Sequence, residues 1–226
     1  MSLEDNLNAV RQEYLRRMTR GNGHLLHQVE DFITSHLGKM LRPKLTLLAA
    51  DTLGQAASHR TILLATAVEM LHNASLIHDD IIDHDLTRRG QPSVNARWDN
   101  SVAVLIGDFL LAQVMRILHE INEPDTTQRF YLTVEAMVEA ELLQKSDQQS
   151  ESTYLRIIDG KTASLFATAC AIANPLYEDF GFHFGRLFQL RDDLADGDGT
   201  SFTPDLIDKE EATLRAIKHT LPIQIK

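Results

Sequence analysis

The chain has 226 residues, of which 43% are hydrophobic, and it carries a formal net charge of −10. This length is enough for one well-buried core. The acidic balance argues against a nucleic-acid partner, because a phosphate backbone needs a basic surface. The one cysteine, Cys170, lies in the apolar run FATACAIA, which favours a buried structural thiol and a reducing, cytoplasmic location. We see no apolar run long enough to span a bilayer and no signal peptide.

Long periodic segments rich in Leu, Ala, Glu and Gln predict an all-α fold, with residues 1–226 forming a single domain. Helices are expected over residues 3–20, 24–37, 43–54, 58–84, 101–121, 126–146, 151–173, 178–196 and 205–220. Residues 85–100 contain Gly90, Pro92 and Asn95, and most of this stretch is expected to be a loop. No alternation of strands and helices and no solenoid repeat is visible in the sequence.

The helix expected over 58–84 ends in an unusual group of acidic residues. Asp79, Asp80 and Asp83 lie at i, i+1 and i+4, where like charges repel and the helix dipole disfavours anions. A hard cation removes this problem, since Mg²⁺ takes oxygen ligands and is usually held by one or two carboxylates together with substrate phosphates. The alternative for this set alone is an acidic helix end exposed to water.

A second set repeats the pattern. Residues 188–196 read FQLRDDLAD and place Asp192, Asp193 and Asp196 at the same three spacings. Because each set follows an apolar helical segment, the two sets can face each other across one cavity. Six carboxylates there need more than one divalent ion, and the ions need an anion between them, for which a diphosphate is suitable. The repetition favours a metal site over solvated acidic faces.

With these motifs the chain resembles the trans-isoprenyl diphosphate synthases of the polyprenyl synthetase family. The resemblance runs from about Gly38 to Asp196 and includes GKMLRP, the Arg-Arg after the first aspartate set, GDFLLAQ and the Lys-Thr of DGKTASLF. It implies a bundle of antiparallel helices around a central cavity. It also implies an enzyme that joins isopentenyl diphosphate to an allylic prenyl diphosphate.

The resemblance implies a mechanism as well. The two aspartate sets would hold about three Mg²⁺ ions, with Mn²⁺ as a substitute, and these would make the allylic diphosphate a better leaving group. The C–O bond ionises to an allylic cation, which the double bond of isopentenyl diphosphate attacks. A proton is then lost to the departing diphosphate, so no side-chain base is required. The cavity must exclude water, which would quench the cation.

Several cations and polar residues receive roles from the same resemblance. One set would bind the diphosphate of isopentenyl diphosphate, and it consists of Lys39, Arg42, His72 and Arg89. A second set, Arg88 and Lys161, would bind the diphosphate of the allylic substrate. His72 lies seven residues before Asp79, two helical turns back on the same face. For each residue alone, the alternative is a surface cation or a core histidine.

Three residues are expected beside the carbon that becomes cationic. These are Lys161, Thr162 and Gln189, of which Thr162 and Gln189 can offer oxygen lone pairs to the developing charge. Neither oxygen is a nucleophile that would trap the cation. For Arg191 two interpretations stay open, contact with substrate or pairing with the neighbouring aspartates.

Product length is expected to depend on the residues before the first aspartate set. In the polyprenyl synthetase family, which this chain resembles, a bulky side chain at the fifth position before the set stops the growing tail. Here that position is Ala74, followed by Ser75. These small residues predict a product longer than C20, with a deeper floor at Met115, Leu118 or Met137. A shorter-chain synthase is the alternative.

The chain departs from the family pattern after the second aspartate set. The stretch DGDGTSFTPDLIDKEEATLR replaces a glycine-lysine segment, and Lys209 is a candidate for the metal-adjacent lysine by position only. The terminal helices look short or missing, which fits either a compact variant or segments absent from this sequence.

Two further classes compete with an active synthase. One is a non-catalytic subunit of a heteromeric synthase, against which the intact aspartates argue. The other is a terpene cyclase, against which Lys39, Arg42 and Arg89 argue, because a cyclase has no second diphosphate to hold. By resemblance we expect a homodimer and a transient contact with a membrane surface during product release.

Overall fold

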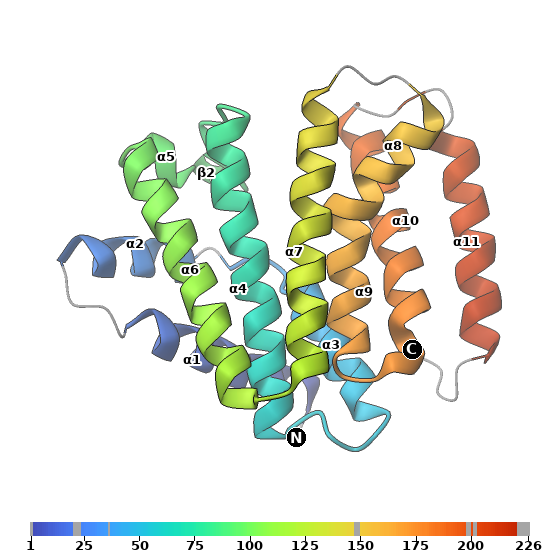
Figure 1. The fold of residues 1–226 in the computed structure, drawn as a ribbon, viewed down its shortest axis with the longest axis horizontal. Helices are drawn as coiled ribbons and strands as arrows, with labels where there is room; N and C mark the ends of the chain where they lie inside the picture. The colour runs from blue at the N-terminus through green and yellow to red at the C-terminus, as the bar shows by residue number, and fades with distance from the viewer. Residues whose placement is uncertain are drawn as a thin grey trace. The chain divides into compact units, whose positions relative to one another are not determined.

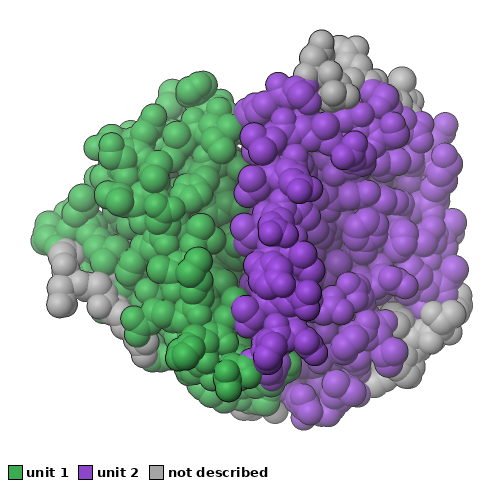
Figure 2. All heavy atoms as spheres, in the orientation of Figure 1, with its two compact units in different colours: residues 1–44, 57–122 green, residues 45–56, 123–226 purple. Residues whose placement is uncertain are grey.

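The computed structural model describes residues 2–19, 24–35, 37–146, 150–197, 200 and 203–220, without the side chains of residues 30, 219 and 220. The described chain is almost entirely helical (Figure 1), which confirms the all-α prediction. It divides into two compact units, residues 1–44 with 57–122 (unit 1) and residues 45–56 with 123–226 (unit 2), coloured separately in Figure 2. The single domain around a central cavity stays a prediction.

In chain order the helices are α1 (Leu3–Met18), α2 (His24–Ser35), α3 (Leu41–Asp51), α4 (His59–Ile82), α5 (Val94–Arg97), α6 (Asn100–Ile121), α7 (Pro124–Lys145), α8 (Glu151–Ile158), α9 (Ser164–Ala171), α10 (Glu178–Asp196) and α11 (Thr203–Thr220). A π-helical turn, η1 (Asp159–Ala163), joins α8 to α9, and a 3-10 turn, η2 (Pro175–Tyr177), precedes α10. Strand β1 (Thr87–Arg88) pairs antiparallel with β2 (Gln91–Pro92).

Unit 1 is built on α4 and α6, which run antiparallel side by side (Figure 1). The Ser58 hydroxyl accepts a hydrogen bond from the Thr61 amide at 3.1 Å and so caps the start of α4. The Asp99 carboxylate caps α6 in the same way, 2.8 Å from the Val102 amide. Helix α4 is buried along most of its length because α1 also packs against it, which holds the first aspartate set at the end of a fixed helix.

In unit 2, α10 lies between α9 and α11 (Figure 1). Glycines permit the close packing: a Cβ added at Gly185 would lie 2.8 Å from the Cα of Ala163, at the end of η1. Helix α10 ends at Gly197, whose φ of 84° is the left-handed conformation that glycine adopts without strain at a helix C-terminus. The second aspartate set therefore occupies the last turn of a packed helix.

Two expected segments differ from the structure. Residues 85–100 contain a two-stranded hairpin and the four-residue helix α5, where we expected mostly a loop. Two-residue strands of mixed polar residues leave no alternating pattern that a sequence would reveal. The helix expected over 151–173 is interrupted by the π turn η1, which changes the hydrogen-bond spacing without any Pro in the segment to mark it.

Helix α6 corrects a third expectation. By length and composition alone it is apolar enough to cross a membrane, so the prediction that no run reaches this length is wrong. Of its most apolar stretch, 44% is buried within the described chain, and a single helix of this kind is weak evidence for a membrane span, because core helices of soluble proteins pass the same test.

Candidate active site

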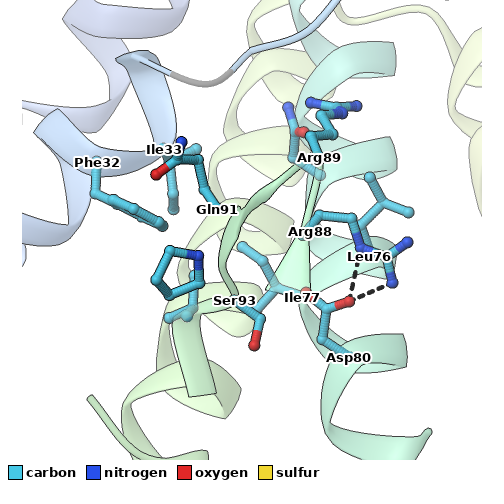
Figure 3. A pocket seen from close by; sticks show the side chains of 12 residues that line it. Phe32, Ile33, Leu76, Ile77, Asp80, Arg88, Arg89, Gln91 and Ser93 are labelled. Atoms are coloured by element: carbon cyan, nitrogen blue, oxygen red, sulfur yellow. Dashed lines mark hydrogen bonds and ion pairs between the residues drawn. The ribbon is translucent and has the colours of Figure 1, made fainter. Parts of the chain in front are cut away.

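The first aspartate set occupies the last turn of α4, and its three carboxylates have different surroundings. Asp80 is only 3% exposed. Its Oδ1 accepts a hydrogen bond at 2.8 Å from Nε of Arg88 and a second, shorter one from the same guanidinium (Figure 3). Burial alone would lower the pKa of Arg88, but these bonds raise it. Asp79 is half-buried and Asp83 is exposed, so these two lie nearer the surface, one helical turn apart.

The hairpin that carries Arg88 and Arg89 is tied to the end of α4. The Ser93 hydroxyl donates to the backbone oxygen of Asp85 at 2.8 Å, and the Asn95 amide donates to the same oxygen at 3.1 Å. Both arginines line a small pocket of about 60 Å³ in unit 1, together with Leu76 and Ile77 of α4 and Phe32 and Ile33 of α2 (Figure 3). The hairpin thus fixes the Arg88 guanidinium beside Asp80.

Arg42, His72 and Arg89, which we call the arginine cluster, gather in unit 1. Arg42 is 9% exposed, and its Nη1 lies 3.1 Å from Nε2 of His72. The guanidinium of Arg89 lies against Gly38, since a Cβ added there would be 2.7 Å from its Cζ. Lys39 is exposed in the turn before α3, so the structure gives its charge no fixed place in the cluster.

Backbone strain accompanies the cluster. Met40 and Arg89 have positive φ angles of 49° and 54°, which side chains other than glycine rarely adopt, and Gly38 has a φ of 62°. Such strained residues concentrate at sites where the surrounding structure holds them in place for a function.

The arginine cluster also contains an acid that the sequence did not reveal. Glu69, 1% exposed, lies one helical turn before His72, and burial raises its pKa to about 7 against the opposing charges of Arg42 and Arg89. Burial lowers the pKa of Arg42 to about 10 and that of His72 well below its usual range. At neutral pH, Arg42 is therefore charged and donates to a neutral His72 ring.

The second aspartate set is also divided by its contacts. Asp193 accepts hydrogen bonds on both oxygens, from Nε2 of Gln189 at 2.6 Å and from the hydroxyl of Tyr154. The Thr162 hydroxyl in turn donates to Oε1 of Gln189 at 2.7 Å. Burial and the bond to Asp193 raise the pKa of Tyr154, so it remains a donor. Within unit 2 the structure thus joins Thr162, Gln189 and Asp193 into one chain, which the sequence did not foresee.

Asp192 and Asp196 are exposed, like Asp83 in the first set. The guanidinium of the neighbouring Arg191 donates to Glu211 of α11, which packs along this side of α10. Both interpretations of Arg191, contact with substrate and pairing with the aspartates, stay predictions. Lys209 is exposed on α11.

Lys161 lies in the π turn η1 and is held by α7. Its Nζ donates to Oε1 of Gln144 at 2.8 Å and forms an ion pair with Glu141. Gly160 makes this approach possible, because a Cβ there would lie 2.6 Å from the backbone oxygen of Ala136. π turns occur frequently at functional sites. The sequence did not indicate the roles of Glu141 and Gln144. Both follow Ala136 and Ala140, the small residues of α7 against which Gly160 packs.

The proposed chain-length residues have mixed surroundings. Ala74 is fully buried in unit 1, and the half-buried Ser75 donates to the backbone oxygen of His72 at 2.9 Å. Leu118 is 8% exposed and Met115 is 69% exposed. Met115 could therefore bound a tunnel only where another surface covers it.

In the part of the chain that the structure describes, no three His, Cys, Asp or Glu side chains gather as a ready-made metal site. The first aspartate set belongs to unit 1 and the second to unit 2. A pair of carboxylates one turn apart, such as Asp79 and Asp83, is still a suitable donor set for Mg²⁺, which takes its remaining ligands from water and substrate phosphates.

The fold and these two units define an all-α protein with aspartate-rich helix ends and a cluster of two arginines and a histidine around the buried Arg42. A sequence model described as polyprenyl synthetase matches residues 24–224, and the chain belongs to this family.

Named relatives agree with this assignment. The chain is 37% identical over 185 residues to an all-trans-nonaprenyl-diphosphate synthase (geranyl-diphosphate specific) of Rhodobacter capsulatus, covering 76% of this chain and 57% of that one. It is 34% identical over 208 residues to heptaprenyl diphosphate synthase component 2 of Bacillus subtilis, covering 86% and 59%. A crystal structure of a Caulobacter crescentus polyprenyl synthase complexed with calcium and isoprenyl diphosphate superimposes with a TM-score of 0.80 at 31% identity, covering 88% and 64%. The chain thus spans less than two thirds of the length of each.

Proposed function

We propose that the protein is a trans-prenyltransferase that condenses isopentenyl diphosphate with an allylic prenyl diphosphate and gives a polyprenyl diphosphate longer than C20. The observation that carries this proposal is the arginine cluster, a cationic site built on the buried Arg42 in the same unit as the aspartate-rich end of α4. A cluster of this kind suits a diphosphate bound without metal. The relatives named as nonaprenyl and heptaprenyl diphosphate synthases support a long product.

Each set of residues has a role in this proposal. Arg42 and Arg89, with Lys39, would hold the diphosphate of isopentenyl diphosphate through charge-assisted hydrogen bonds. Neutral His72 accepts from Arg42 and so fixes the orientation of that guanidinium. Lys161 and Arg88 would bind the allylic diphosphate.

The chain of hydrogen bonds in unit 2 serves the developing cation. Because the Thr162 hydroxyl donates to Gln189, its lone pairs point away from that bond and remain able to face a positive carbon. The bond from Gln189 to Asp193 holds the amide in one orientation. Neither group forms a covalent bond to the cation.

The two aspartate sets would hold the metal, with the more accessible carboxylates of Asp79, Asp83, Asp192 and Asp196 as its nearest ligands and the hydrogen-bonded Asp80 and Asp193 as supports. Bound Mg²⁺, about three ions with Mn²⁺ as a substitute, would neutralise the allylic diphosphate and make it a better leaving group. The Caulobacter crescentus structure, which is complexed with calcium and isoprenyl diphosphate, supports a divalent ion acting together with a diphosphate.

The proposed product length depends on Ala74 and Ser75, where small side chains would leave room for a long tail. We expect Ala74→Phe to shorten the product, because an aromatic ring would obstruct the path. Ala74 is fully buried, so Ser75→Phe, at a half-buried position, serves as the second variant if the first is unstable. Product chromatography measures the change, and wild-type product of only C15 or C20 would contradict the long-chain proposal.

A second candidate function is a synthase component that works only with a partner chain. The Bacillus subtilis relative is named component 2, which favours this alternative. The leading proposal includes a homodimer in the cytoplasm and brief contact with a membrane surface during product release. Exposed apolar side chains of α6, including Leu105 at 67% and Met115 at 69%, offer the dimer an interface.

One assay tests these proposals. Purified protein is incubated with Mg²⁺, farnesyl diphosphate and radiolabelled isopentenyl diphosphate, and the products are separated by chain length. We expect elongation beyond C20 by the protein alone and none with EDTA. Elongation only after a partner chain is added would favour the second candidate, and no elongation in either case would reject both.

A further inference from the structure

Glu69 is a buried acid for which the condensation itself has no use. It lies on α4, where its side chain forms a hydrogen bond with Asn73, one turn later on the same face. It is 1% exposed, and a carboxylate removed from water to that degree is costly unless nearby positive charge compensates it. The compensating charges are those of Arg42 and Arg89, the two guanidiniums of the arginine cluster.

The groups that face Glu69 come from every segment around it. From α1, Tyr14 is fully buried and lies near Glu69, and its hydroxyl accepts from Nδ2 of Asn73 at 3.4 Å. From α3 and the hairpin come Arg42 and Arg89. Helix α6 places its two acids elsewhere, with Asp108 3.8 Å from His78 of α4 and Glu120 2.6 Å from Arg17 of α1. Glu69 thus lies between two cations and two neutral polar groups.

A diphosphate bound to Arg42 and Arg89 would bring a second anion to the guanidiniums that Glu69 already balances. Both anions would then lie close together at the buried Glu69 and Arg42, where like charges repel strongly. We propose that Glu69 is a positioning residue, the resident counter-anion of Arg42 and Arg89, and that it takes up one proton from solvent when a diphosphate binds them. This inference rests on the proposed function and extends it to the protonation of the site.

The chemistry of the step is simple. The Glu69 carboxylate accepts a proton from water or buffer and becomes a neutral carboxylic acid, and no other bond forms or breaks. Because burial already raises the pKa of Glu69 to about 7, the added negative charge needs to raise it only a little further to change its protonation near neutral pH. The neutral acid still offers an oxygen to the side-chain amide of Asn73, so the hydrogen bond between Glu69 and Asn73 can remain.

The test is a calorimetric titration of inorganic diphosphate into the protein with EDTA, repeated at several pH values in two buffers of different ionisation enthalpy. The buffer dependence gives the number of protons taken up. Glu69→Gln mimics the protonated acid, and Glu4→Gln, at an exposed position on α1, is the matched control. Protons bound by the ligand itself are common to all three proteins and cancel in the comparison.

We expect wild type and Glu4→Gln to take up more protons than Glu69→Gln near pH 7.5. Wild type should bind as tightly as Glu69→Gln at pH 6 and about fivefold less tightly at pH 8.5, where Glu69 resists protonation. Asn73→Ala removes a bond that favours the carboxylate, so its maximum of proton uptake should shift to higher pH.

Equal proton uptake by wild type and Glu69→Gln overturns the inference, as does folded Glu69→Gln that no longer binds diphosphate at pH 6. If Glu69→Gln fails to fold, an unshifted maximum in Asn73→Ala overturns it instead. These results leave the proposed function intact when the protein still elongates isopentenyl diphosphate. Wild type that binds no diphosphate at any pH overturns both.

Discussion

Gly38 is the residue that most directly positions a guanidinium of the arginine cluster. Its φ of 62° and the missing Cβ allow Arg89 to lie where a methyl group would be 2.7 Å from Cζ. Gly38→Ala is expected to strain the backbone by about 1–2 kcal/mol and to displace Arg89. Binding of inorganic diphosphate, measured by calorimetry without metal, should weaken about tenfold or more, because a charge-assisted bond is lost.

Gly54→Ala is the matched control for this prediction. Gly54 has a similar φ of 69°, and an added Cβ would meet nothing within 4 Å. The Gly54→Ala variant should lower the free energy of unfolding through the same backbone strain and leave diphosphate binding unchanged. If both variants bind diphosphate as wild type does, the position assigned to Arg89 is wrong.

Glu69 also predicts how stability depends on pH. Its pKa is raised from 4.5 to about 7 in the folded chain, so between these values the folded state keeps a proton that the unfolded state has released. The free energy of unfolding should therefore fall as pH rises from about 4.5 to 7 and level off above, by up to about 3 kcal/mol. Urea unfolding of wild type and Glu69→Gln across this range measures the effect, and identical slopes would contradict it.

The sequence indicated the aspartate sets and the residues of the arginine cluster, but not how the burial and hydrogen bonds of their members differ. Spacing placed Asp80 and Asp193 in the sets. The hydrogen bonds of Asp80 with Arg88 and of Asp193 with Tyr154 depend on partners from other segments, which spacing does not reveal. Glu69 gave no signal either, because one acid in an apolar helix resembles any solvated residue until its neighbours are known.

At the scale of elements, α11 is joined to the π turn through one side chain. Arg186 of α10 binds both oxygens of Asp159 at 2.7 and 2.8 Å and Oε1 of Glu210 at 2.7 Å. Arg186→Leu would leave two acids, one of them buried, without this cation. We expect the free energy of unfolding to fall by about 2–3 kcal/mol.

Arg215→Ala tests whether this effect is specific. Arg215 pairs with Glu211 on the exposed face of α11, where an ion pair contributes little. Its removal should leave urea unfolding unchanged within error. Equal losses in the two variants would mean that α11 is held by its apolar face rather than by Arg186.

Long helices were predictable because their apolar periodicity extends over several turns, as in α4, α6, α7 and α10. The hairpin and the π turn were not, for a common reason. Each depends on a few bonds to other segments, those of Ser93 and Asn95 for the hairpin and the packing of Gly160 on α7 for the π turn. Both elements carry candidate site residues, so the site was harder to predict than the fold.

For the whole molecule, the proposed homodimer gives a direct prediction. Leu105→Arg places a charge on the apolar face of α6, which should convert a dimer into a monomer because a charge buried in an interface is costly. Leu176→Arg is the control, since Leu105 and Leu176 are equally exposed, at 67% and 68%, on different units. Sedimentation velocity measures the mass of each variant. A dimer that survives Leu105→Arg and dissociates in Leu176→Arg would place the interface elsewhere.

The central claim is that the aspartates of α4 and those of α10 act on one diphosphate through shared metal. Mg²⁺-dependent binding of farnesyl thiodiphosphate, an unreactive allylic analogue, tests it in wild type, Asp79→Asn and Asp192→Asn, with Asp205→Asn on α11 as control. We predict one analogue per chain and a loss of about tenfold or more in affinity for either of the first two variants, because each would remove a proposed metal ligand. Wild-type affinity in Asp79→Asn or in Asp192→Asn would contradict the account.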